Sequence, residues 1–148
     1  MKNTLLALLA LTTLASAQTT AIARLESTAH NRAHGTVWFI QQKDDRLRVV
    51  AHIIGLPANS SHGFHLHQVW KSAAIDLGAL KADDFGVADL DVVLPGPKVA
   101  ELMQRPVTLH AGDSEISANM AVGTVREADA KAMAEMPSQA TFGGVKKP

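Results

Sequence analysis

The sequence predicts a single all-β domain, built as an antiparallel sandwich or barrel. Short segments rich in Val, Ile, Trp and Phe recur between polar turns, as strands of such folds do. Helical periodicity is weak until the last third of the chain. A length of 148 residues suits one domain, and an apolar content of 47% is enough for a core. We find no internal repeat, low-complexity tract or linker that would divide the chain.

Seven segments have the composition of strands. They are residues 21–26, 36–42, 46–54, 63–69, 77–82, 86–93 and 106–110. The polar turn at 43–45 predicts a hairpin between the second and third strands, and the Asp-rich turn at 83–85 predicts another. Residues 99–104 form one helical turn or a loop. The Ala- and Glu-rich segment 126–136 is predicted to be a helix that ends before Pro137.

The N-terminus is predicted to be a cleaved signal peptide, residues 1–17. A basic residue, Lys2, precedes an apolar run at 5–14, and Ala15-Ser16-Ala17 fits the small-residue cleavage rule. The alternative is a membrane anchor, but the run is shorter than the ~20 residues that a spanning helix needs. The mature domain is therefore expected to be residues 18–148, secreted or periplasmic, and without membrane association after cleavage.

Composition excludes several kinds of site. The chain has no cysteine, which rules out disulfides, thiolate catalysis, iron–sulfur clusters, Cys-type zinc sites and blue-copper sites. Fourteen basic residues balance fourteen acidic ones, so the sequence lacks the net positive charge that is typical of nucleic-acid-binding proteins. Metal chemistry must therefore use the seven histidines, methionines or carboxylates.

The histidines concentrate in one motif, His62-Gly63-Phe64-His65-Leu66-His67. Because strand side chains alternate between two faces, His65 and His67 should point to one side and Phe64 and Leu66 into the core. His110, at the end of a predicted strand, is a candidate third ligand. Three imidazoles suit Cu, Zn, Ni or Fe. The residues alone support a three-histidine metal site, and histidines with only a packing or surface role remain the alternative.

Several segments, in order, resemble the Cu/Zn superoxide dismutase family. The copper-site signature of that family is similar to Gly55-Leu56-Pro57 followed by residues 62–67, and its late strand is similar to Val107-Thr108-Leu109-His110. Residues 34–39, 76–80 and 82–88 resemble further family segments. The resemblance implies an eight-stranded Greek-key barrel and one copper ion held by His65, His67 and His110. It also implies that His62 is a buried brace beside the metal.

The chain departs from the family at the positions of the zinc ligands and of the catalytic arginine. Only eight residues separate His67 from Asp76, none is histidine, and Ala73 stands at the position of the last zinc histidine. Asp76 alone cannot hold zinc, so it is expected to be a turn or supporting residue. Ala140 stands at or near the position of the family's catalytic arginine. Arg126 and Lys131, in a long predicted loop at 111–139, are candidates to replace that charge.

These features predict a secreted copper-binding protein with a mononuclear three-histidine site, no zinc, and weak superoxide dismutase or other copper redox activity as an oxidoreductase. The alternative is a copper-sequestering or copper-delivery protein without dismutase activity. The expected partners are a copper ion and superoxide, and a homodimer is one option for assembly. Two smaller questions concern other histidines. His30 and His34 form either an auxiliary copper site or part of a solvated segment, and His52 is expected on the surface of its strand.

Overall fold

The computed structural model describes residues 19–67, 74–114 and 116–138. These residues form eight strands, one turn of 3-10 helix and one short α-helix. In chain order they are β1 (Thr20–Ser27), β2 (His34–Gln41), β3 (Arg46–Ile54), β4 (Ser61–Leu66), β5 (Ile75–Lys81), β6 (Ala88–Pro95), η1 (Val99–Leu102), β7 (Pro106–His110), β8 (Asn119–Glu127) and α1 (Ala130–Glu135).

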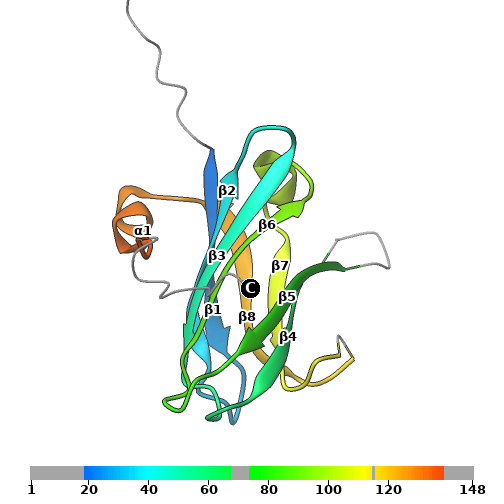
Figure 1. Cartoon of the computed structure of the whole chain (residues 1–148), viewed down its shortest axis with the longest axis vertical. Coiled ribbons are helices and arrows are strands. Elements are labelled where there is room, and N and C mark those ends of the chain that lie inside the picture. Colours follow the sequence, from blue (N-terminus) through cyan, green and yellow to red (C-terminus); the bar gives the residue numbers. More distant parts are fainter. Residues whose placement is uncertain (1–18, 68–73, 115, 139–148) are drawn as a thin grey trace, which may run out of the picture.

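The strands form one antiparallel sheet in the order β5-β4-β7-β8-β1-β2-β3-β6. The sheet curls into a nearly closed barrel whose two edge strands, β5 and β6, lie close at the turn that joins them and then diverge (Figure 1). The hairpin predicted across 83–85 is wrong, because within the described residues β5 pairs with β4 and β6 pairs with β3, and the two do not pair with each other. The predicted all-β fold with eight strands and one short helix is confirmed. The predicted hairpin between β2 and β3 is present, with Gln41 opposite Leu47.

Apolar and polar residues alternate along the strands, so one face of each strand lines the core inside the barrel. On β3, for example, Leu47, Val49, Ala51 and Ile53 are almost fully buried and face inward. Burial of such side chains contributes about 1.5–3 kcal/mol each relative to exposure. The alternation therefore fixes which face of each strand meets the core.

The prediction of a long loop at 111–139 is wrong, because β8 lies within it. β8 pairs with both β7 and β1, which joins the two halves of the barrel. Arg126 and Glu127, predicted to begin the helix, instead extend β8 opposite Ile22 and Ala21. The helix is consequently shorter than predicted. Interstrand hydrogen bonding here outweighs a helix propensity worth tenths of a kcal/mol per residue.

α1 packs on the outside of the barrel over an apolar cluster of Ile22, Trp38, Ile40, Val50 and Ala132. A helix this short is unstable alone and depends on such packing. The indole Nε1 of Trp38 donates to the carbonyl of Ala132 at 2.8 Å.

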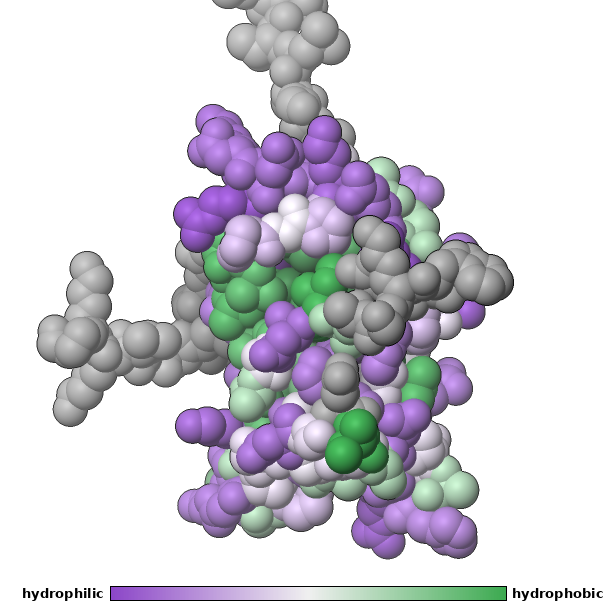
Figure 2. Space-filling view, turned by 90° about the vertical axis from the view of Figure 1, so that its right-hand side faces the viewer, coloured by the Kyte–Doolittle hydropathy of each residue, from purple (hydrophilic) through white to green (hydrophobic). Residues whose placement is uncertain are grey.

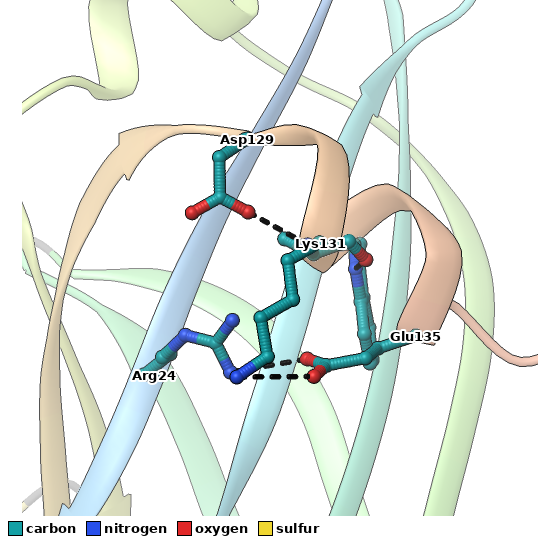
Figure 3. A network of polar contacts seen from close by, with 6 residues as sticks. Arg24, Asp129, Lys131 and Glu135 are labelled. Carbon is teal, nitrogen blue, oxygen red and sulfur yellow. Dashed lines mark hydrogen bonds and ion pairs between the residues drawn. The ribbon is translucent and has the colours of Figure 1, made fainter.

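Polar contacts at both ends of α1 complete its attachment (Figure 3). Asp129 caps the N-terminus by accepting from the Ala132 amide at 2.7 Å, and Arg24 reaches Glu135 at 3.2 Å. α1 is thus held by one buried cluster, one cap and a surface ion pair.

The side of the barrel where β5 and β6 diverge is less well covered. Ile75, Leu90, Val92 and Leu94 face the core but are only partly buried. Figure 2 shows apolar surface on this side, bordered by polar side chains. Within the described residues, no helix has the length and apolar character needed to cross a membrane.

Candidate metal centre

Two predicted ligands, His65 on β4 and His110 on β7, lie close together, and the third, His67, follows the end of β4. Phe64 and Leu66 are fully buried in the core, as the alternation predicts, and His65 projects from the other face of β4. The ring of His110 lies 5.1 Å from that of His65 and 6.0 Å from that of His67, measured between centroids. His65 is 9% exposed and His110 is 1% exposed, so both imidazoles are withdrawn from water.

The strand opposite each of the two buried histidines carries one extra residue, Leu77 on β5 and Met120 on β8. The register of β4 on β5 shifts between Phe64 and His65, and that of β7 on β8 shifts between Leu109 and His110. A bulge bends the strand that carries it and is common beside functional sites. Both histidines therefore lie opposite an irregularity of the neighbouring strand.

One nitrogen of His110 carries a free lone pair. Nδ1 lies 3.0 Å from the carbonyl of Ser117, and a carbonyl can only accept, so Nδ1 holds the proton. In a neutral imidazole, Nε2 is then unprotonated. Nε2 is buried and has no hydrogen-bond partner.

His65 has no hydrogen bond that fixes its proton. Its Nε2 lies 3.9 Å from a carboxylate oxygen of Asp76, which is within ion-pair range but too long for a hydrogen bond. Nδ1 is buried and unpartnered. Asp76 also accepts from the Gly78 amide at 2.8 Å, as expected of a turn residue. Among buried side-chain polar atoms of the described chain, His65 Nδ1 and His110 Nε2 alone lack a partner.

His62 braces the backbone behind His110. Its Nδ1 donates to the His110 carbonyl at 2.9 Å, its Nε2 is hydrogen-bonded to Ser60 Oγ at 2.6 Å, and it is 1% exposed. The neighbouring Gly63 leaves room for the loop that carries Ser117. A Cβ atom there would stand 2.7 Å from the carbonyl oxygen of Asp113 and 3.1 Å from the His65 ring.

His67 lies just beyond β4 and is half-buried. Its amide donates to the Pro106 carbonyl at 2.9 Å, which keeps it alongside β7. As the side chains stand, no three His, Asp or Glu residues in the described part of the chain could hold a metal ion together. The structure therefore presents two free donor atoms, with a third imidazole beside them.

The basic residues suggested as substitutes for the family's arginine lie elsewhere. Arg126 is seven positions along β8 from Asn119, which is opposite His110, and seven residues span roughly 23 Å of strand. Lys131 is on α1, 3.8 Å from Glu135. Both were therefore wrong candidates. Ala73 and Ala140 lie outside the described residues.

Sequence reasoning did not identify Ser117 or Asn119 as neighbours of the site. Ser117 acts through its backbone carbonyl, which any residue could supply, so no side-chain pattern reveals it. Asn119 can be recognised as a neighbour of His110 only from the pairing of β8 with β7. The predicted exposed position of His52 is correct, since it pairs with Asp89 on the outer face of the sheet.

No protein-family model matches the sequence, and no curated protein matches it. Solved structures do resemble it. The clock protein EA4 superposes with a TM-score of 0.60 at 20% identity, over 75% of this chain and 96% of that one. Superoxide dismutase 5 of Candida albicans, in its Cu(II) form, superposes with a TM-score of 0.56 at 14% identity, over 83% and 97% of the two chains. At these identities the likeness concerns the fold, and this chain has the superoxide dismutase-like β-barrel fold.

Proposed function

We propose that the mature domain, residues 18–148, is an exported copper-binding protein, released from a signal peptide at 1–17. One copper ion is held by His65, His67 and His110, and no zinc is bound. The observation that carries this proposal is the pair of buried, unpartnered nitrogens, His65 Nδ1 and His110 Nε2. Leaving such atoms unsatisfied costs about 1–3 kcal/mol each, which a bound metal would relieve.

The donor set suits copper. Three imidazoles bind copper more tightly than the other divalent first-row ions, by the general affinity order. The likeness to the Cu(II) form of Candida albicans superoxide dismutase 5 supports the same ion. A copper ion there would supply one-electron redox chemistry.

The residues around the histidines affect that chemistry through their hydrogen bonds and their charge. The Ser117 carbonyl sets the proton of His110 so that its Nε2 presents a lone pair, and the Asp76 carboxylate lies 3.9 Å from His65. Half-buried His67 leaves an approach from solvent. For superoxide, an anion, the nearby charge is unfavourable: Asp76 is exposed and Asn119, opposite His110, is neutral. We therefore propose weak superoxide dismutase activity.

The second candidate function is copper sequestration or delivery without dismutation. The placement of Arg126 and Lys131 on another part of the molecule favours it, because neither can draw an anion to the histidines. Pulse radiolysis of the copper-loaded mature protein separates the two. A rate above that of free copper supports the enzyme, and a rate no greater leaves the binding function.

Metal analysis tests the copper site itself. The mature protein, loaded and then passed over a chelator of moderate affinity, should retain one copper and no stoichiometric zinc. His110→Ala should lose that copper, and His30→Ala, in an exposed loop, should keep it. Retention of zinc in place of copper, or equal copper retention by His110→Ala, would contradict the proposed site.

A further inference from the structure

The outer face of the sheet carries a second pair of histidines, His34 on β2 and His52 on β3. Both are exposed, and they are diagonal neighbours: Thr36 is opposite His52, and His34 is opposite Ile54. Diagonal neighbours on adjacent strands are about 7–8 Å apart, within reach of long side chains. At Gly35, between them, a Cβ atom would overlap the carbonyl oxygen of His52, so the two strands approach closely here.

Hydrogen bonds set both imidazoles to the same tautomer. His34 Nδ1 lies 2.8 Å from the carbonyl of Arg32, and His52 Nδ1 lies 2.7 Å from a carboxylate oxygen of Asp89. Both oxygens can only accept, so each Nδ1 carries the proton and each neutral ring presents its lone pair at Nε2. An imidazole held by a carboxylate or carbonyl in this way is the usual form of a metal-ligating histidine.

The surrounding charges favour a cation. Glu26 of β1 is exposed and follows Leu25, which is opposite Gly35, so it adds a negative charge to the end of β1 next to this part of β2. Arg48, on the same face, is bound to Asp91 by two hydrogen bonds of 2.8 and 2.7 Å, which raise the pKa of its guanidinium. Arg24 is paired with Glu135. Arg24 and Arg48 are thus already neutralised by carboxylates, whereas Arg32, which is exposed and two residues before His34, keeps its charge.

We propose that His34 and His52 form a second, surface metal site that binds a divalent transition ion through both Nε2 atoms. Cu²⁺ is the preferred ion by the general affinity order, and Zn²⁺ and Ni²⁺ also fit two imidazoles. Water completes the coordination, so the ion is bound more weakly and exchanges faster than at His65 and His110. This site is independent of the proposed copper centre.

Zn²⁺ is the probe for the test, because it is diamagnetic. Imidazole nitrogen NMR of the mature protein, preloaded with one equivalent of Cu⁺, which is also diamagnetic, should show the Nε2 resonances of His34 and His52 shifting together as Zn²⁺ is added. His34→Ala and His52→Ala should each weaken Zn²⁺ binding at least about tenfold, and Asp89→Asn should weaken it less. His30→Ala is the matched control and should bind unchanged.

Other outcomes would overturn the proposal. If only one of the two histidines responds, or if His52→Ala leaves the response of His34 unchanged, they do not share an ion. His110→Ala removes the proposed copper centre and should leave the Zn²⁺ response of His34 and His52 intact. Loss of that response in His110→Ala would assign the binding to the first site, so the two proposals fail separately.

Discussion

Two regions of this barrel withdraw polar groups from water in different ways. Beneath α1, the buried indole N–H of Trp38 is matched by the Ala132 carbonyl. Between β4 and β7, His65 Nδ1 and His110 Nε2 have no match. A protein can pair buried polar atoms, as it does under the helix, so the unpaired nitrogens call for an explanation, and the proposed metal supplies one. The first region serves stability, and the second is the proposed binding site.

Trp38→Ala should give the largest effect on stability. Removing this side chain empties the cluster under α1 and frees the Ala132 carbonyl, so the free energy of unfolding should fall by about 3–5 kcal/mol. Urea denaturation measures the loss. Copper affinity of the folded variant should be unchanged, because Trp38 does not contact the histidines. A comparable loss of copper affinity would show that the two regions are coupled.

Copper should stabilise the mature protein by an amount that depends on His110. At free copper 1,000-fold above the dissociation constant, the gain in unfolding free energy should be about 4 kcal/mol. Thermal unfolding in chelator-buffered copper measures it. His110→Ala should show almost none of this gain, whereas Trp38→Ala should keep it. An equal gain in both variants would remove the functional distinction between the regions.

Gly63→Ala should affect the binding region in two ways. The added methyl would press on the Asp113 carbonyl and the His65 ring, at a cost of about 1–3 kcal/mol. Because His65 must shift, copper affinity should fall as well. Chemical denaturation and copper competition measure the two effects, and Gly96→Ala, where a Cβ atom meets only Leu47 at 3.5 Å, is the control. Unchanged copper affinity would mean that the orientation of His65 does not matter.

Asp129→Ala should have the smallest of these effects. Loss of the N-cap of α1 should lower the unfolding free energy by about 1 kcal/mol, and Asp129→Asn should restore most of it. Copper binding should not change. A stability loss that Asp129→Asn fails to restore would assign the effect to the charge of Asp129 and not to capping.

Strand alternation predicted much of the fold. The segments around Leu47–Ile53 and Phe64–Leu66 were placed correctly because apolar residues recur at every second position. β8 was missed because its last residues, Arg126 and Glu127, continue into a helix-like sequence, and Gly123 interrupts its pattern. Pairing with β1 and β7 decided its conformation, and such long-range pairing leaves little local signal.

The His62–His67 motif determined by itself that His65 would face away from the core, because strand geometry has period two. Charge and cysteine content likewise determined what the site cannot be. Only the tertiary structure decided which nitrogens are free. The lone pair of His110 depends on the Ser117 carbonyl, and those of His34 and His52 depend on the Arg32 carbonyl and on Asp89. A hydrogen-bond acceptor fixes the proton of an imidazole only where the fold brings it within reach, and backbone carbonyls carry no sequence signature.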